Sequence, residues 1–353
     1  KMTLDFYLKP FVKTRIKGWV RQLLWMSLYQ YVFLDKIPNH AIINEAVNIA
    51  KRRGGQHNGN IVNAILRHIF KSDLPTLETI KNEKQRMTIE YSIPRWIIEH
   101  WITHYGIETA HKIAKSFLVQ SASTVRVNTS RTDVETISKA LLQEGYHVDI
   151  DQLIPYCLHL TGKPVIESRA FKDGLISIQD KSSMLVGYLM DVQKGDTILD
   201  ACSAPGGKAC HMAELLASTG HVDATDIHMH KIGLIKENIK KLKLKNMSTF
   251  DHDATQPYSE QYDKILVDAP CSGLGVLRHK PEIKYVQSKD SINDLVEIQL
   301  SILDNVKYNE RQSIGWSQVK MKAVLHNEAI KNVIQKIEQD QLDYIVIDQF
   351  AKR

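Results

Sequence analysis

The feature that most constrains this chain is the alternation of short apolar runs with amphipathic segments between residues 174 and 306. The runs GLISIQ, TILDAC, HVDATDI, STFDHD and DKILVDAP are separated by helical patterns such as KACHMAELLA and HKIGLIKENIKKL. Repeated strand–helix units predict an α/β fold, a parallel sheet covered by helices. Ligands of such sheets bind at the carboxyl ends of the strands, so we expect the functional residues in the loops there.

The residues that precede this alternation have other patterns. VRQLLWMSLYQYVFL and IVNAILRHIF have the spacing of amphipathic helices, and the Gly/Asn-rich GGQHNGN predicts a break between helices. STVRVNTS alternates like a strand and VETISKALLQEG like a helix, which predicts a small αβ module. Arg126 and Asn128 are polar positions on that strand, and two readings stay open: solvent-facing residues or RNA contacts.

Composition excludes several classes of protein. Lys and Arg exceed Asp and Glu by 46 − 40 = +6, a mildly basic balance that permits a polyanionic partner without requiring one. No apolar run approaches the roughly 20 residues of a membrane span. The four cysteines show no CxxC pairing. We therefore expect a cytoplasmic protein without a membrane segment or a structural metal.

A glycine loop and a series of carboxylates indicate the ligand. The loop DACSAPGGK, residues 200–208, follows one strand and opens a helix, and its paired glycines allow close backbone approach. Asp226, Asp253 and Asp268 stand at the ends of the next strands. A sulfonium and an amino group favour carboxylates over the anion-binding amides of a phosphate site. This favours S-adenosyl-L-methionine, with a nicotinamide dinucleotide and a dehydrogenase as the alternative.

The motifs QDKSS, DACSAPGGK, DATD and DAPCSGLG, in this order, resemble the Nop/Sun family of RNA cytosine-5 methyltransferases. NEAVNIAK and VNAILR resemble the helical RNA-binding module of the antitermination factor NusB, which precedes the bacterial Sun/Fmu type. The resemblance covers about residues 3–307. It implies an all-helical NusB-like domain, then a Rossmann-like methyltransferase domain that is incomplete at its C-terminus. The implied activity is S-adenosylmethionine-dependent methylation of a cytosine in 16S ribosomal RNA, by a monomer.

The resemblance also assigns site residues. The implied cofactor contacts are Cys202, Ser203, Ala204, Pro205, Gly206, Gly207, Lys208, Asp226, Asp253 and Asp268. Cys271 matches the family's Pro-Cys cysteine, a supporting thiol. The family's attacking thiol, which adds to cytosine C6, lies in a later Thr-Cys motif, and no cysteine follows Cys271 here. The alternative to an active enzyme is therefore a module that binds RNA and cofactor without turnover.

The C-terminal segment has a different resemblance. From about residue 307 to 353 the chain resembles an internal fragment of bacterial ribonuclease H type III, and Asp348 matches one of that family's metal-binding carboxylates. A two-metal nuclease needs several carboxylates, so ribonuclease activity is the weakest hypothesis. We expect reduced stability from a poorly matched tail with a helix over 318–339. The expected domains are 1–75 (NusB-like), 76–165 (αβ module), 166–306 (methyltransferase core) and 307–353 (foreign tail).

Overall fold

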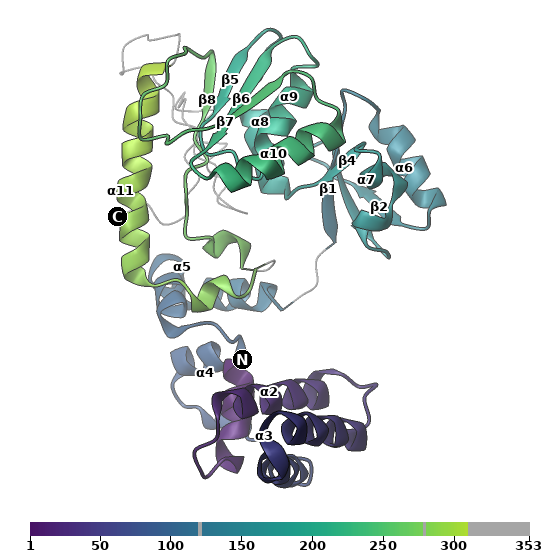
Figure 1. The fold of residues 1–353 in the computed structure, drawn as a ribbon, viewed down its shortest axis with the longest axis vertical. Helices are drawn as coiled ribbons and strands as arrows, with labels where there is room; N and C mark the ends of the chain where they lie inside the picture. The colour runs from purple at the N-terminus through teal and green to yellow at the C-terminus, as the bar shows by residue number, and fades with distance from the viewer. Residues whose placement is uncertain (119–121, 278–279, 310–353) are drawn as a thin grey trace. The chain divides into compact units, whose positions relative to one another are not determined.

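The computed structural model describes residues 1–118, 122–277 and 280–309, apart from the side chains of residues 289–293 (Figure 1). The chain divides into two compact units, Lys1–Gln120 with Val276–Val286, and Ser121–Gly275 continuing from Gln287. Among the helices described, none combines the length and apolar character that a membrane span requires. The helix and strand expected after residue 309, and the carboxylate of Asp348, lie outside the described residues.

The first unit is helical. Its α-helices are α1 (Met2–Leu8), α2 (Gly18–Phe33), α3 (Asn39–Ile69), α4 (Glu83–Glu90) and α5 (Arg95–Ser116). Its short 3₁₀ helices are η1 (Lys9–Phe11), η2 (Leu77–Thr79) and η5 (Ile283–Tyr285). Apolar side chains at helical spacing, among them Leu24, Leu28 and Leu66, are fully buried in its core. The predicted break within GGQHNGN is a kink centred on Gly55, whose φ of 78° leaves the helical region.

An antiparallel sheet opens the second unit, with the strand order β2-β3-β1-β4. Its strands are β1 (Ser123–Val127), β2 (His147–Ile150), β3 (Cys157–Thr161) and β4 (Ile176–Ile178). The associated helices are α6 (Val134–Gln143), η3 (Val165–Glu167) and α7 (Arg169–Lys172). The run GLISIQ was expected in the parallel sheet, but β4 pairs antiparallel with β1. Its apolar pattern predicts a strand, whereas the choice of sheet depends on a partner about 50 residues earlier in the chain.

The parallel sheet has the order β7-β6-β5-β8. Its strands are β5 (Thr197–Asp200), β6 (His221–Asp226), β7 (Met247–Asp251) and β8 (Lys264–Leu266). Its helices are α8 (Lys181–Leu189), α9 (Gly207–Leu215), α10 (Met229–Leu242) and α11 (Lys289–Val306), with η4 (Leu274–Val276) and η6 (Lys307–Asn309). Because β6 and β8 flank β5 on opposite sides, the strand order reverses there, and the carboxyl ends of β5 and its neighbours are where ligands of such sheets bind.

Helices cover the parallel sheet on both sides of its central strand β5, whose residues Ile198–Asp200 are buried. Ile198, Leu199 and Val222 are fully buried, as expected for a parallel strand between two helical layers. On α11, Ile302 and Val306 are buried in the same cluster as Leu199. α11 therefore contributes to the core around β5.

Candidate cofactor site

The glycine loop between β5 and α9 is held by backbone contacts. The Ser203 amide donates to the Thr225 carbonyl at 2.7 Å, which ties the loop to β6. Gly206 precedes α9 with a φ of 95°, and a Cβ there would lie 3.0 Å from Ile235 Cγ2. At Gly207 a Cβ would meet only Gln179 Nε2, 4.0 Å away. Gly206 is thus required by the loop's conformation, whereas Gly207 leaves open space at the start of the helix.

Four carboxylates converge on this loop. Burial, and then the charges of Asp200, Asp268, Asp226 and Asp253 in that order, raise the pKa of the Cys202 thiol to about 12. All four act on one thiol, so the ends of four successive strands contribute to a single acidic site. At that pKa the Cys202 thiol stays protonated at neutral pH and does not serve as a nucleophile.

Asp200 is the residue that the sequence analysis missed. Its side chain is completely buried, and neither carboxylate oxygen has a hydrogen-bond partner among the described residues. Burial, and then repulsion from Asp268, raises its pKa to about 7, while Lys208 acts in the opposite direction. The buried hydroxyl of Ser203 also has no partner in hydrogen-bond geometry, but it lies close enough to Asp200 to lower the pKa of that carboxyl. The signal was present in the sequence, because Asp200 ends its strand as the other three aspartates end theirs or follow them closely.

The other three carboxylates have partners. Asp226 accepts a hydrogen bond from the His228 amide at 3.0 Å. Asp253 accepts from the amide and the hydroxyl of Thr255, at 2.9 and 2.8 Å, and the amide bond is the largest cause of its lowered pKa. Asp268 pairs with Lys208 in the first turn of α9. These contacts hold three acceptor groups in fixed positions at the carboxyl edge of the sheet.

This donor set fits S-adenosylmethionine. The unpartnered oxygens of Asp200 are buried acceptors, which would be costly to leave without a cation or a donor. A ligand with a sulfonium, an ammonium and a ribose diol offers the required groups, whereas a pyrophosphate would be repelled by four carboxylates. The structure brings the predicted loop Cys202–Lys208 together with Asp226, Asp253 and Asp268 at one edge of the sheet.

Cys271 lies on the loop that follows β8, and its side chain is exposed. The loop is supported by Gln299 of α11, whose Nε2 donates to the Pro270 carbonyl at 2.8 Å. Cys157 and Cys210 are buried, and burial raises the pKa of each thiol to about 12. Among the chain's four cysteines, only Cys271 is exposed enough to react with a macromolecular substrate.

The burial of Arg126 and Asn128 contradicts the expectation that polar side chains of the strand STVRVNTS are accessible. Both readings of Arg126 and Asn128 required accessible side chains, but each residue is 1% exposed. Arg126 donates to both carboxylate oxygens of Glu214, at 2.9 and 2.8 Å, and to the Gly207 carbonyl at 3.1 Å. It also donates to Gln179. An alternating pattern identifies a strand but does not show that its second face packs against another sheet's helix.

The fold and the site define a Rossmann-like methyltransferase, with a parallel sheet, a glycine loop and strand-end carboxylates that fit S-adenosylmethionine. A family described as 16S rRNA methyltransferase RsmB/F matches residues 187–351. The NusB family matches residues 1–71, and the ferredoxin-like domain of RsmF/B-like methyltransferases matches residues 93–167. This chain belongs to the RsmB/F family. The family match includes the segment that resembles ribonuclease H, most of which lies outside the described residues.

Individual proteins agree with this assignment. The chain is 39% identical over 344 residues to a probable ribosomal RNA small subunit methyltransferase B of Bacillus subtilis, covering 95% of this chain and 77% of that protein. It is 31% identical over 314 residues to ribosomal RNA small subunit methyltransferase B of Pasteurella multocida, covering 85% and 68%.

Solved structures share the fold. The crystal structure of the protein PH0851 superposes with a TM-score of 0.75 at 26% identity, covering 86% of this chain and 70% of that chain. NSun6 from Pyrococcus horikoshii, solved with SFG, gives a TM-score of 0.58 at 21% identity over 62% of this chain and 81% of that chain. The predicted helical NusB-like domain followed by a Rossmann-like domain is therefore confirmed.

Proposed function

We propose that this chain uses S-adenosyl-L-methionine to methylate C5 of a cytosine in small-subunit ribosomal RNA. Membership of the RsmB/F family supports the reaction class and the RNA substrate. The observation that carries the proposal is the convergence of four strand-end carboxylates on the glycine loop. This acidic, partly unpartnered site suits a cationic adenosine cofactor and is unsuited to a dinucleotide.

Each site residue has a role in this proposal. Asp226, at the end of β6, would accept hydrogen bonds from the ribose diol, and Asp253 would lie beside the adenine. Asp200 and Asp268 would face the cationic part of the cofactor. When bound, the cofactor supplies an electrophilic methyl group. The open space at Gly207 allows the loop Cys202–Lys208 to contact it through backbone groups.

Cytosine C5 needs activation before it accepts a methyl group. A thiolate adds to C6, which makes C5 nucleophilic, and after methylation a base removes the C5 proton so that the thiolate leaves. The target base must be unstacked for this attack, which favours loops or splayed nucleotides of the RNA. Cys271 is the exposed thiol at this edge of the sheet. By its family match it supports the reaction, whereas the family's attacking thiol belongs to a later Thr-Cys motif.

A second candidate function is a module that binds RNA and cofactor without turnover. The point in its favour is that residues 272–353 do not contain the Thr-Cys motif that the family resemblance implies after Cys271. Transfer of a tritiated methyl group to undermodified small-subunit RNA separates the two. Transfer that Cys271→Ala abolishes would assign attack to Cys271, and absent transfer with cofactor binding retained would select the binding module.

Cofactor binding itself is tested by calorimetry with Asp226→Asn. We expect the dissociation constant for S-adenosylmethionine to rise by about tenfold or more, because a hydrogen bond to a charged acceptor contributes roughly 1.5–3 kcal/mol. Asp149→Asn is the control, since Asp149 is an exposed acid on β2. Equal affinities for the two variants would contradict the assigned site. We further propose that the protein is a cytoplasmic monomer. Light scattering of the purified protein tests its oligomeric state.

A further inference from the structure

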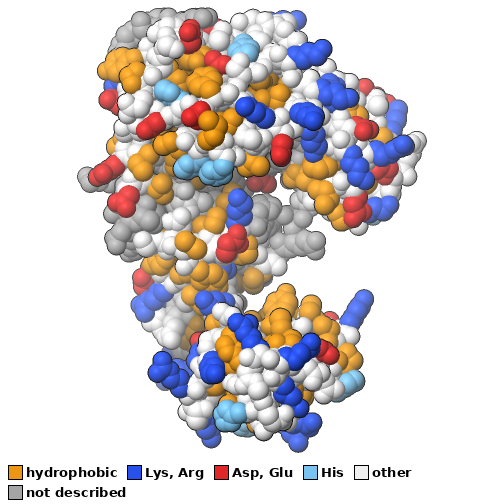
Figure 2. All heavy atoms as spheres, in the orientation of Figure 1, with side chains coloured by type: hydrophobic (Ala, Val, Ile, Leu, Met, Phe, Trp, Pro, Cys, Tyr) orange, Lys and Arg blue, Asp and Glu red, His pale blue; other side chains and the backbone are white. Residues whose placement is uncertain are grey.

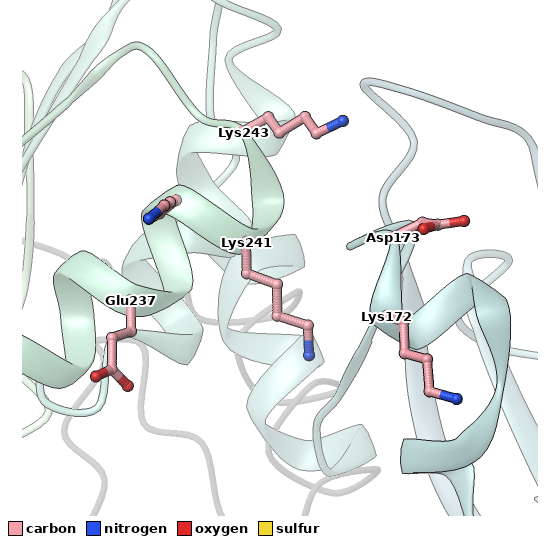
Figure 3. Close-up of a pocket in the computed structure, with 6 residues that line it drawn as sticks. Lys172, Asp173, Glu237, Lys241 and Lys243 are labelled. Carbon is pink, nitrogen blue, oxygen red and sulfur yellow. The ribbon is translucent and has the colours of Figure 1, made fainter.

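A second concave site lies in the same compact unit, between α7 and the C-terminal end of α10. The cavity measures about 400 Å³ and is lined by Lys172, Asp173, Glu237, Lys240, Lys241 and Lys243 (Figure 3). Four lysines against two acids make its lining net positive. None of the residues assigned to the cofactor site lines this cavity.

The two walls of the cavity are in direct backbone contact. Gly174, two residues after the end of α7, has a φ of 68°, and a Cβ there would lie 2.1 Å from the Lys241 carbonyl oxygen. Arg131 fixes the same turn, because its Nη1 donates to the carbonyls of Asp173 and Gly174 at 3.0 and 3.1 Å. Only glycine permits this approach, so the two walls are held in direct contact at this point.

The lysines are not neutralised by the protein. None of the four forms an ion pair with a residue in the described part of the chain. Lys241 points into the gap, with Nζ 2.9 Å from the centre of the Phe171 ring, and its partial burial lowers its pKa. Figure 3 shows the carboxylates of Asp173 and Glu237 directed away from that ammonium group. An anion in this cavity would be attracted by the four ammonium groups.

A role in helix termination explains only part of this cluster. Lys240 and Lys241 lie in the last turn of α10, where cations interact favourably with the helix dipole. Lys172 comes from a different helix, and Lys243 follows the end of α10. Figure 2 shows further Lys and Arg side chains over the face formed by α10 and the neighbouring antiparallel-sheet module. The positive surface therefore extends beyond what one helix terminus would require.

We propose that this lysine pocket binds phosphate groups of the RNA backbone at a distance from the cofactor site. The proposal rests on the proposed function, since it assigns a contact of the same RNA substrate. α10 begins at Met229, shortly after Asp226, and its 14 residues span about 21 Å at 1.5 Å per residue. Phosphate contacts fix the position of a nucleic acid without reading its sequence, so the pocket would orient the RNA while other residues select the cytosine.

The test compares charge reversals by RNA binding, which does not depend on turnover. The double variant Lys240→Glu/Lys243→Glu changes two exposed lysines of the pocket. Its matched control, Lys139→Glu/Lys194→Glu, changes two exposed lysines elsewhere in the same unit. Binding of unmodified 16S RNA would be measured at several salt concentrations, with the dissociation constant for S-adenosylmethionine as a check on folding.

We expect the pocket variant to bind the RNA about tenfold more weakly than the control. The slope of log K against log salt should fall in magnitude by about 1–2, because each lost phosphate contact removes roughly 0.7–0.9 from it. Cofactor affinity should be unchanged. Equal RNA affinities and salt slopes for the two double variants would contradict phosphate binding by the lysine pocket and would leave the proposed function intact. If the unaltered chain binds cofactor but no RNA, both proposals are wrong.

Discussion

The guanidinium of Arg126 and the carboxylate of Glu214 form a bidentate ion pair with N–O distances of 2.9 and 2.8 Å, and their side chains are 1% and 2% exposed. The pair joins β1 of the antiparallel sheet to α9 of the parallel sheet. Because Arg126 also donates to the Gly207 carbonyl, the antiparallel module supports the glycine loop directly. Arg126 is therefore a positioning residue for the cofactor site.

Arg126→Met should destabilise the protein strongly. The substitution leaves Glu214 buried without its cation, and breaking a buried pair in this way costs about 3–5 kcal/mol. Urea unfolding gives the free energy of unfolding, and the control is Arg95→Met, which removes an exposed pair with Glu99. The control should cost less than about 1 kcal/mol.

The double variant Arg126→Met/Glu214→Leu separates stability from positioning. Replacing both charges with apolar side chains of similar size is often nearly neutral, so stability should largely return. Affinity for S-adenosylmethionine should remain reduced, because the Gly207 carbonyl loses the Arg126 donor and keeps only the longer bond from Gln179 Nε2 at 3.5 Å. Full recovery of cofactor affinity with stability would limit the pair to a structural role.

Gly206→Ala should lower the stability of the protein, whereas Gly207→Ala should lower its affinity for the cofactor. At Gly206 a left-handed φ of 95° and a Cβ 3.0 Å from Ile235 should cost about 1–3 kcal/mol of stability. At Gly207 the Cβ meets nothing closer than 4.0 Å, so stability should change little. The added methyl would occupy the space assigned to the cofactor, and we expect affinity to fall by about tenfold. Thermal melts measure the stability of both variants, and calorimetry measures their affinity for S-adenosylmethionine. Unchanged affinity in Gly207→Ala would contradict the assignment of this loop to cofactor binding.

Asp200 should make the free protein less stable as pH rises. Its pKa is raised from 3.8 to about 7, so its contribution is fully present below pH 4 and is lost as pH rises through 7. Three pKa units correspond to an upper limit of roughly 4 kcal/mol. Asp200→Asn cannot ionise, so its melting temperature should fall less between pH 5 and pH 8. Parallel melting curves for the two proteins over that range would show that Asp200 does not titrate there.

Ile302→Ala should destabilise the methyltransferase core. Ile302 is 3% exposed and packs with Leu199 and Tyr262, so truncation leaves a cavity that costs about 2–5 kcal/mol. Ile298→Ala on the same helix is the control, since Ile298 is 44% exposed. The control should shift the denaturation midpoint only slightly. Similar midpoints for both variants would mean that α11 does not cover the sheet in solution.

Much of the cofactor site could be predicted from local sequence. A strand ending in Asp, followed by a Gly-Gly loop and a helix, specifies a βα turn, and the carboxyl ends of parallel strands necessarily share one edge. The glycine loop, Asp226, Asp253 and Asp268 follow from this rule, whereas the individual contacts Cys202–Lys208 came from the family resemblance; the structure places all of them together. Asp200 obeys the same rule, since it is the last residue of β5.

Tertiary structure alone decided which polar residues are buried and which strands pair. The period of an alternating strand does not reveal what covers each face, so Arg126 could not be matched with Glu214, 88 residues away. The same limit applies to β4, whose apolar run fits either sheet. The lysine pocket likewise depends on a backbone contact between Gly174 and Lys241, remote in sequence. Local sequence therefore determined the elements and the cofactor loop, while long-range packing determined how they are joined, because burial and ion pairing depend on neighbours that a local pattern does not contain.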